Sequence, residues 1–492
     1  MGIIKRIKRL FGGGGAMDKK QDPTFFDKSI LLTLYEEYIM SQQFYWYGVG
    51  QRYYKGENDI LNRIMTTTKD GTKIIDDSQP NNKLNHAFMK ALVDQKVNYS
   101  FGNPFKFSCD NEMYLKQVED ILKENRFNYK SKVAATMASN DGLTWIHPYI
   151  TETGKFKFDI IPAEQIIPQW ADDMHETLKS CIRAYNITSY ELGTPQEMTI
   201  LEYWTPEGFT RYRINGDSLI PLAMDLETIT SGSLNGQVPH YQKGNQAKSW
   251  GKVPFICFKN NIDEFCDVRY VKNLIDNYDL TRSDLGNALE QLRNFIIVLE
   301  NAQGTDLDEF LENLKLYGVI KTTNVDGSGT SANILSNPID CQASTEHTQL
   351  LKQNIIELLQ GVNLNLELKI PPSGVALQLL YSGLDIKASG FETEFQQAFN
   401  DLLYFINIYL EEDNKLNPTN IEEITIDFIR NMPQNTSEQI QNVKNSQGIV
   451  SNKTLYHNHP FVKNADEEEK QVNKENTVHE AYWDNVPPLP GE

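Results

Sequence analysis

The sequence lacks the cysteine spacing of a structural metal site or of a disulfide framework. Its five cysteines are Cys109, Cys181, Cys257, Cys266 and Cys341, and no two of them form a C-x-x-C pair. An odd number of widely scattered cysteines argues against paired disulfides and against zinc. We therefore expect reduced thiols and no bound metal.

Long apolar runs are also missing. The longest ones, such as residues 295–299 and 402–410, fall far short of the roughly 18 residues that a membrane-spanning helix needs. With 40% hydrophobic and 23% charged residues, the composition is that of a folded protein without a membrane span. The N-terminal MGIIKRIKRLFGGGG is too broken for a secretory signal, which indicates a cytoplasmic protein. Residues 1–24 predict a flexible basic arm, with a short amphipathic helix on a partner or lipid surface as the alternative.

Positive charge is scarce. The chain has 47 Lys and Arg against 66 Asp and Glu, which gives a formal net charge of −19. Such a chain would repel nucleic acid unless its basic residues were gathered on one face. This balance argues against a protein that grips DNA tightly, and it suits a surface past which DNA slides without adhering.

Motifs of catalysis are absent too. Gly251-Lys252 is followed by Val253, so the hydroxyl of a phosphate-binding GxxxxGK[ST] loop is missing. His457-Asn458-His459 is consecutive, whereas the residues of HNH nucleases are dispersed along the chain. The acidic pairs Asp76-Asp77 and Asp172-Asp173 have no companion with metal-site spacing, and no GxSxG elbow occurs. The sequence therefore predicts a protein that is not an enzyme and that binds no cofactor.

Periodicity in the first half predicts an α+β fold. Apolar residues at helical spacing are followed by short alternating segments with turn residues between them. A polar Gly/Ser/Gln-rich stretch at residues 230–248 reads as an exposed loop. The predicted helices cover residues 28–54, 83–98, 112–124 and 128–140, and the predicted strands cover 143–150, 155–160, 180–185, 199–204, 209–214 and 253–258.

The second half is dominated by long helices. Residues 268–297 carry an apolar stripe without proline and predict a helix of roughly 45 Å. A small insert follows, with a helix at 307–316 and strands at 317–322 and 332–335 around NVDGSGTS. An ordinary helical core or a coiled-coil dimer is the alternative, although the heptad is broken. The later predictions are helices at 347–360, 376–412, 437–446 and 452–457, a non-helical GVNLNLELKIPPS, a strand at 423–428, and disorder from 464.

One stretch carries a family resemblance. Residues 82–107 contain the pattern D-x-K-x-x-Y-x-x-G-x-P at Asp94, Lys96, Tyr99, Gly102 and Pro104. This stretch resembles the entry segment of portal proteins, the head-tail connectors of tailed bacteriophages that infect Gram-positive bacteria. Further similar blocks follow in the same order, so that the resemblance covers residues 25–475: IIPAEQIIPQW, GKVPFICFKNN, PPSGVALQLLYSGLDIKA and GIVSNKTLYHNHPFVKNADEEEK.

The resemblance implies a division of the chain into named parts, assembled as a dodecameric ring. An α/β wing would carry a stem of long helices, a small α/β clip and a helical crown. The implied parts are a basic arm at 1–24, wing at 25–267, first stem helix at 268–297, clip at 298–346, second stem helix at 347–360, tunnel loop at 361–373, long wing helix and strand at 374–432, crown at 433–463 and acidic disordered tail at 464–492.

The resemblance also implies the function and the sites. Double-stranded DNA would be packaged and ejected through the ring at one capsid vertex of the virion, after assembly in the host cytoplasm. The partners would be other copies of the chain, the terminase large subunit, a head-tail adaptor, and the major capsid and scaffolding proteins. The implied DNA channel residues are Asn363, Leu364, Asn365, Leu366, Glu367 and Lys369, and the implied partner-binding residues of the clip are Asn324, Asp326, Ser328 and Thr330.

Two other classes of protein stay open at this point. One is a metal-dependent enzyme that acts on nucleic acid, and the other is a capsid scaffolding protein. The enzyme would require a metal-binding carboxylate cluster, and the sequence shows none. In the implied ring, DNA carries one negative charge per about 1.7 Å of its axis, so a lysine-lined bore would hold it. The implied tunnel loop has only Glu367 and Lys369 as charged residues.

Overall fold

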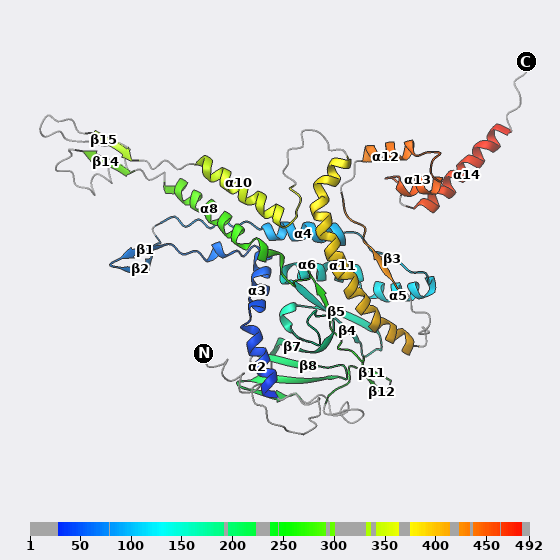
Figure 1. Cartoon of the computed structure of the whole chain (residues 1–492), viewed down its shortest axis with the longest axis horizontal. Helices are drawn as coiled ribbons and strands as arrows, with labels where there is room; N and C mark the ends of the chain where they lie inside the picture. The colour runs from blue at the N-terminus through cyan, green and yellow to red at the C-terminus, as the bar shows by residue number, and fades with distance from the viewer. Residues whose placement is uncertain are drawn as a thin grey trace, which may run out of the picture. The chain divides into compact units, whose positions relative to one another are not determined.

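The structure is a computed structural model that describes residues 28–77, 79–190, 195–222, 237–244, 246–291, 296–300, 331–335, 341–363, 374–413, 423–432, 436–462 and 464–484. The chain divides into two compact units. The first is formed by Met1–Tyr45, Trp145–Ile256 and Asp401–Thr419, and the second by Trp46–Thr144, Cys257–Asn400 and Asn420–Glu492. Figure 1 follows the elements along the chain.

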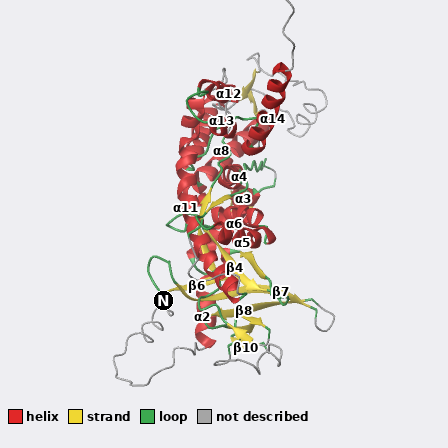
Figure 2. Ribbon diagram, turned by 90° about the vertical axis from the view of Figure 1, so that its right-hand side faces the viewer, coloured by secondary structure: helices red, strands yellow, loops and turns green. Residues whose placement is uncertain are grey.

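An antiparallel sheet of five strands lies in the first unit, in the order β10–β9–β8–β7–β6. Its long strands β7 (Leu178–Ser189) and β8 (Gln196–Trp204) lie side by side (Figure 2). Helix α2 (Lys28–Ile39) contacts β6, β7 and β10 and buries Leu31. The remaining strands of this sheet are β6 (Ile166–Trp170), β9 (Phe209–Asn215) and β10 (Ser218–Pro221).

Aromatic side chains pack around His147 in the first unit. Its ring stacks on Phe255 at 4.4 Å between centroids and meets Trp204 edge-on at 5.2 Å. Burial lowers the pKa of His147 to about 4, although the carbonyl of Pro254 opposes this. Burial likewise lowers the pKa of His240 to about 4. Both imidazoles are therefore neutral near pH 7.

The C-terminal turns of the long helix α11 (Gly374–Glu412) also belong to the first unit. Glu412 accepts hydrogen bonds from the Tyr241 hydroxyl at 2.9 Å and from Lys248 Nζ at 2.8 Å. These two residues lie on the hairpin of β11 (Tyr241–Lys243) and β12 (Gln246–Lys248). This end of α11 is thereby fastened to the hairpin. Strands β4 (Leu143–Ile150) and β5 (Phe156–Ile161) pair antiparallel, and η2 (Ala163–Gln165) follows them.

The second unit is mainly helical. Helices α8 and α10 pack against each other (Figure 1). The helices are α3 (Gln42–Lys55), η1 (Asp59–Asn62), α4 (Phe88–Phe101), α5 (Glu112–Glu124), α6 (Phe127–Asp141), η4 (Asp267–Tyr270), α8 (Lys272–Gln291), α10 (Cys341–Leu358), the first part of α11, α12 (Thr436–Asn445), α13 (Asn452–Asn458) and α14 (Ala465–Asp484). The strands are β1 (Thr66–Lys69), β2 (Thr72–Ile75), β3 (Lys106–Ser108), β13 (Ile256–Lys259), β14 (Ile296–Glu300), β15 (Ser331–Leu335) and β16 (Thr425–Asp427).

A cluster of phenylalanines forms the core of the second unit. Phe391, Phe395 and Phe399 recur every four residues, which places them on one face of α11. Phe101 at the end of α4 meets Phe395 edge-on at 4.9 Å between centroids. Edge-to-face contacts of this kind add roughly 0.5–1.5 kcal/mol per pair beyond the burial of apolar area. Phe105, Phe107, Phe127, Phe258 and Phe428 complete the cluster.

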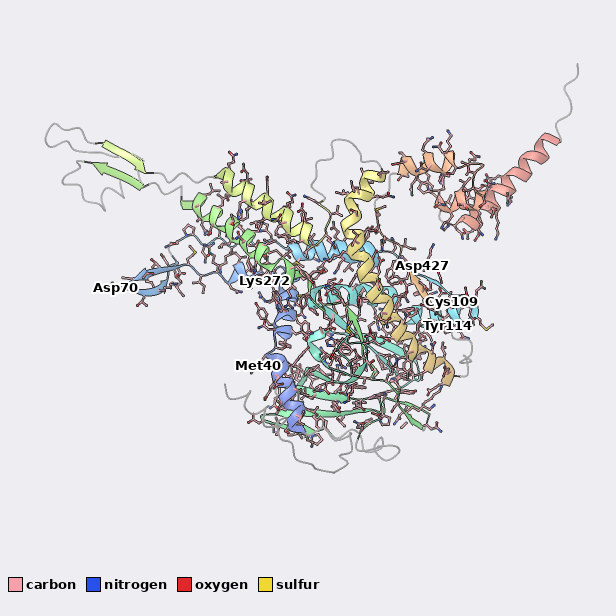
Figure 3. The ribbon with its side chains drawn as sticks, viewed as in Figure 1. Met40, Asp70, Cys109, Tyr114, Lys272 and Asp427 are labelled. Atoms are coloured by element: carbon pink, nitrogen blue, oxygen red, sulfur yellow. The ribbon has the colours of Figure 1, made fainter. Side chains whose placement is uncertain are left out.

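Two pairs of short antiparallel strands also lie in this unit, one between segments distant in the sequence and one between adjacent segments. Strand β16 pairs antiparallel with β3, with Ile426 opposite Phe107. Strands β1 and β2 form a local hairpin with its turn at Asp70 and Gly71, and Figure 3 labels Asp70 at its tip. Asp70 has a positive φ of 52°, a conformation that Asp adopts more readily than most residues. Strand alternation did not predict this hairpin, because its residues are mostly polar.

The predicted boundaries hold in several places. Helix α5 and strand β4 match the predictions at both ends, and α11 begins two residues before its predicted start. Helix α5 is capped by Asn111, whose side chain accepts the Tyr114 N–H. The predicted helix at 28–54 is two helices, because Ser41 caps α3 by accepting the Phe44 N–H at 3.1 Å.

Three predictions in the second half need correction. The predicted helix at 268–297 ends at Gln291, because residues 296–300 form the β-branched strand β14 that pairs with β15. The described partner of β15 is therefore β14, while residues 307–322 lie outside the described part of the chain. Helix α10 begins at Cys341, six residues before its predicted start at 347.

The tail predicted to be disordered from 464 contains helix α14. Asn464 caps it by accepting the N–H groups of Asp466 and Glu467 at 3.1 and 3.3 Å. The acidic residues 466–468 lie in its first turn, where the helix dipole favours negative charge. The same acidic cluster that suggested a solvated tail therefore stabilises a helix start. Across the described residues, no helix has both the length and the apolar character needed to cross a membrane.

Candidate functional site

The C-terminal end of α10 leads directly into the predicted tunnel loop. Gln360 takes a positive φ of 55°, and the Gly361 N–H donates to Ile356 O at 2.8 Å, as in a Schellman cap. A Cβ at Gly361 would lie 2.5 Å from the Cδ2 of Leu92 on α4. Glycine at this position therefore allows the end of α10 to approach α4 closely.

Gln95 on α4 holds the backbone of Val362 with two hydrogen bonds. Its Oε1 accepts the Val362 N–H at 2.7 Å, and its Nε2 donates to Val362 O at 3.1 Å. The buried Val362 side chain packs in a cluster with Tyr99, Tyr381 and Leu384. The first residues of the predicted tunnel loop are thus fixed by both polar and apolar contacts.

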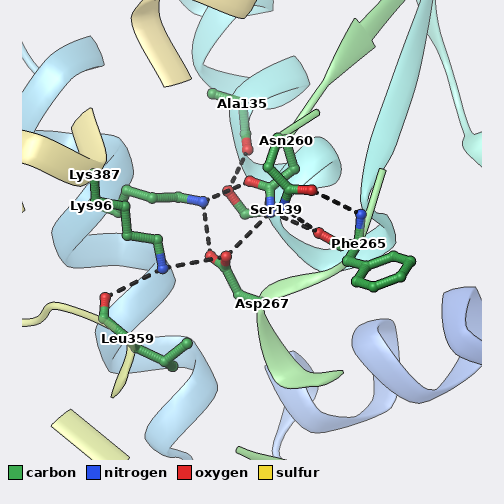
Figure 4. Close-up of polar contacts among 9 residues, drawn as sticks. Lys96, Ala135, Ser139, Asn260, Phe265, Asp267, Leu359 and Lys387 are labelled. Carbon is green, nitrogen blue, oxygen red and sulfur yellow. Dashed lines mark hydrogen bonds and ion pairs between the residues drawn. The ribbon is translucent and has the colours of Figure 1, made fainter. Parts of the chain in front are cut away.

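A buried ion pair lies beneath this junction (Figure 4). Lys96 Nζ lies 2.7 Å from Asp267 Oδ2 and donates to Asn260 Oδ1 at 2.7 Å. The Lys96 and Asp267 side chains are only 2% and 4% exposed. Burial lowers the pKa of Lys96 to about 8, against the opposing effect of Asp267. Burial alone would raise the pKa of Asp267, but Lys387 and Lys96 outweigh it and hold that pKa below its usual range.

Lys387 on α11 connects the ion pair to the end of α10. Its Nζ lies 3.2 Å from Asp267 Oδ1 and donates to Leu359 O at 3.2 Å (Figure 4). Carbonyl groups in the last turn of a helix lack partners within the helix, and a cation there is favourable. Lys387 therefore connects α11, the start of η4 and the C-terminal end of α10.

Tyr99 and Arg430 extend this network along α11. The Tyr99 hydroxyl donates to Asp385 Oδ1 at 2.9 Å, and burial together with this carboxylate raises the pKa of Tyr99 to about 12. Arg430 contacts the same Asp385 and donates to Glu392 Oε2 at 2.7 Å. The Asn431 N–H donates to Tyr99 O at 2.8 Å. The non-helical segment after β16 (Thr425–Asp427) is thereby joined to both α4 and α11.

Helix α8 is fastened to residues 53–86 by a polar row. Asp279, Ser283 and Asn287 recur every four residues and are buried on one face. They accept hydrogen bonds from Asn58 Nδ2 at 2.6 Å, the Leu84 N–H at 2.9 Å and the Asn82 N–H at 2.7 Å, respectively. Figure 3 labels Lys272, which begins α8 and pairs with Asp59 at 2.6 Å and Asp276 at 2.7 Å.

These three polar residues of α8 hold the helix against residues 53–86. Burial raises the pKa of Asp279, while hydrogen bonds from Asn58 and His86 oppose the shift. Asp279, Ser283 and Asn287 each accept a hydrogen bond from a different residue, and the loss of any one of these donors would cost about 1–3 kcal/mol. The predicted stem helix therefore has a defined register against residues 53–86.

A pocket of about 570 Å³ opens at the same junction, between α4, α10 and α11. Leu92 and Ile356 contribute to its mainly apolar lining, together with Tyr381 and Leu384. Asn363 lies at the pocket as well. It is the predicted channel residue that the structure describes.

The other predicted site residues lie outside the described part of the chain. These are Leu364, Asn365, Leu366, Glu367 and Lys369 of the tunnel loop and Asn324, Asp326, Ser328 and Thr330 of the clip. All five cysteines are free thiols. In the described ranges, no group of three or more His, Cys, Asp or Glu side chains is arranged to hold a metal ion.

Sequence reasoning missed the network that holds the loop. Lys96 belongs to the D-x-K-x-x-Y-x-x-G-x-P pattern, but its partner Asp267 is 171 residues away along the chain, and no local sequence pattern pairs the two. No sequence pattern predicts the anchoring contacts of Gln95 and Lys387. The polar row of α8 is visible in the sequence only as a spacing of four between Asp279, Ser283 and Asn287, because the same helix carries many other polar residues.

Comparison with known proteins agrees with the resemblance. Residues 36–478 match the family described as phage portal protein, SPP1 Gp6-like. The chain is 31% identical over 431 residues to the portal protein of Bacillus phage SPP1, which covers 87% of this chain and 82% of the relative. It is also 31% identical over 446 residues to the portal protein of Clostridium phage phiCD119, which covers 87% of this chain and 92% of the relative. The chain therefore belongs to the SPP1 Gp6-like family of phage portal proteins.

Proposed function

We propose that twelve copies of this chain form a ring at one vertex of a phage capsid and that double-stranded DNA enters and leaves through its central channel. Portal proteins are structural components of the virion, and their family is not a family of enzymes. The supporting observation is the match over residues 36–478, which includes the predicted tunnel loop. The anchoring of Val362 by Gln95 adds a physical reason for its position.

The chemistry of the loop suits sliding contact. A bore lined with lysines would release counterions from the phosphates and hold DNA in place. Residues 363–369 read NLNLELK, so one carboxylate and one ammonium group accompany neutral side chains. We assign Asn363, Leu364, Asn365, Leu366, Glu367 and Lys369 to brief contacts with DNA. In the proposed ring, the anchors Gln95 and Lys387 of every copy would keep these loop residues at one level of the channel.

The remaining parts follow from the same proposal. Residues 268–297 and 347–360, which include α8 and most of α10, would form the stem. Residues 298–346 would form the clip, 25–267 and 374–432 the wing, and 433–463 the crown. The clip residues Asn324, Asp326, Ser328 and Thr330 would contact the terminase large subunit during packaging and a head-tail adaptor afterwards. Major capsid and scaffolding proteins would surround the ring in the host cytoplasm, before the virion is complete.

Negative-stain electron microscopy of the purified full chain tests this proposal. The expected class averages show rings with a central hole and twelvefold symmetry. Solitary particles without a hole, at concentrations and salt conditions that favour assembly, would contradict it. Closed shells would instead support a scaffolding protein, and magnesium-dependent cleavage of plasmid DNA would support a nucleic-acid enzyme.

A further inference from the structure

The first turns of α11 expose an apolar stripe. Val375, Leu379 and Ile386 are 72%, 76% and 68% exposed. At about 100° per residue, they fall within a narrow arc of the helix surface. The other exposed residues between positions 375 and 386 are Ala376, Gln378 and Ser382, and none of these six carries a charge.

An uncharged stripe of this kind is unusual on a solvated helix. The charged neighbours Asp385 and Lys387 point to other partners, since Asp385 accepts from Tyr99 and Arg430 and Lys387 contacts Asp267. Surfaces with contiguous exposed apolar side chains mark sites of protein–protein contact. The stripe therefore has the character of an interface.

The pocket at the loop anchor has the complementary character. Its lining includes Tyr381 and Leu384, which lie about 150° around α11 from the stripe. The opposite faces of the same helical turns thus carry a convex apolar surface and one wall of a concave, mainly apolar pocket. Ala91 and Leu92 of α4 form part of the far side of that pocket.

We propose that the stripe of Val375, Leu379 and Ile386 docks into the pocket of a second copy of this chain, and that this contact joins neighbours around the ring. A ring needs a head-to-tail contact between two different, complementary surfaces of one copy. Copies related by rotation stay at the same height, so both surfaces must lie at one level. Opposite faces of the same turns of α11 meet this requirement.

The contact would complete the loop anchor with residues of the neighbour. The pocket includes Val362 and Asn363, so a stripe seated in it would lie next to the start of the tunnel loop. Assembly would then exclude water from the hydrogen bonds between Gln95 and Val362. This inference rests on the proposed ring and adds which surfaces hold it together.

Charge introduced into the stripe tests the inference. Leu379→Glu should weaken association by at least about a hundredfold, because the neighbour would bury a carboxylate in an apolar pocket. Its side chain is exposed in one copy, so circular dichroism and the thermal unfolding midpoint should not change. Met113→Glu on α5 is the matched control, because Met113 is also 76% exposed. That variant should form rings like the wild type.

A mixture of two defective variants tests the pairing itself. Ala91→Trp should fill the pocket from its rim while its stripe stays intact, and Leu379→Glu has an intact pocket. Each variant alone should remain monomeric, whereas a 1:1 mixture should give heterodimers in native mass spectrometry, because one good stripe can meet one good pocket. A mixture without heterodimers would overturn the inference.

Cross-linking distinguishes a wrong interface from a wrong function. In a Cys341→Ser background, the pair Leu379→Cys and Ala91→Cys should give a ladder of linked chains after oxidation, and neither single cysteine should. Suppose that the wild type forms rings. If the Leu379→Glu variant also forms rings, or if the cysteine pair gives no ladder of linked chains, the proposed interface is wrong and the proposed function still stands. Absence of rings from the wild type would count against the proposed function, while the ladder would still report the contact.

Discussion

Replacing Lys96 by methionine should be among the most costly single changes at the loop anchor. Methionine fills a similar volume but removes the ammonium group that lies 2.7 Å from Asp267 and donates to Asn260. Removing one partner of a buried ion pair costs about 3–5 kcal/mol. Because Lys387 remains 3.2 Å from Asp267, we expect a loss near the lower end, about 3 kcal/mol.

A double-mutant cycle separates the pair from the packing around it. Asp267→Leu alone leaves Lys96 buried without its carboxylate and should also lower the free energy of unfolding by about 3 kcal/mol. The combination Lys96→Met with Asp267→Leu replaces the pair by apolar side chains, so it should cost clearly less than the sum of the single changes. The expected coupling is at least about 2 kcal/mol.

Urea unfolding followed by tryptophan fluorescence measures these differences. Lys453→Met is the control, because Lys453 also lies 2.7 Å from an aspartate, Asp466, but both side chains are 62% exposed. It should leave the midpoint unchanged, since exposed pairs contribute little. The reasoning fails if Lys96→Met is as mild as Lys453→Met, or if the two changes at positions 96 and 267 are additive.

Three further changes test other parts of the structure. Gln95→Met removes both hydrogen bonds to Val362 and should speed hydrogen exchange of the Val362 amide by about 5- to 150-fold, corresponding to about 1–3 kcal/mol; unchanged exchange would argue against the clamp. Ser283→Ala leaves the Leu84 N–H without its acceptor and should cost about 1–2 kcal/mol in urea unfolding, with faster exchange at the Leu84 amide as the local sign. The pKa of His147 is about 4 in the folded chain and near 6.5 in the unfolded chain, so the unfolded chain binds more protons and the free energy of unfolding falls as the pH drops from 6.5 to 4. His147→Phe should make that fall shallower, and an equally steep fall would contradict the burial of a neutral His147.

Regular periodicity made part of the fold predictable. Helix α5 has a capping asparagine and an amphipathic face, and β4 is a largely buried strand that begins directly after Gly142, so both match their predicted limits. The apolar face of α11 at Phe391, Phe395 and Phe399 was also visible in the sequence. Local sequence patterns were therefore sufficient to predict α5, β4 and the apolar face of α11.

The features that the sequence did not predict depend on contacts between residues far apart in the chain. Strand β14 ends the predicted stem helix early because its partner β15 begins 31 residues further on, after Glu300. The predicted helix start at residue 83 moves to Phe88, and the Leu84 and His86 N–H groups of the preceding segment bond to side chains of α8. The family resemblance located the tunnel loop, but its anchors Gln95 and Lys387 depend on contacts across the fold.

The passage of DNA beside the anchored loop is the central claim, and cross-linking tests it most directly. A photoreactive amino acid at Asn363 should form adducts with DNA in capsids stalled during packaging, while the same group at exposed Met113 should not. DNA adducts at position 363 that depend on stalled packaging would support the channel. Absence of adducts there, or equal yields at both positions, would contradict the account.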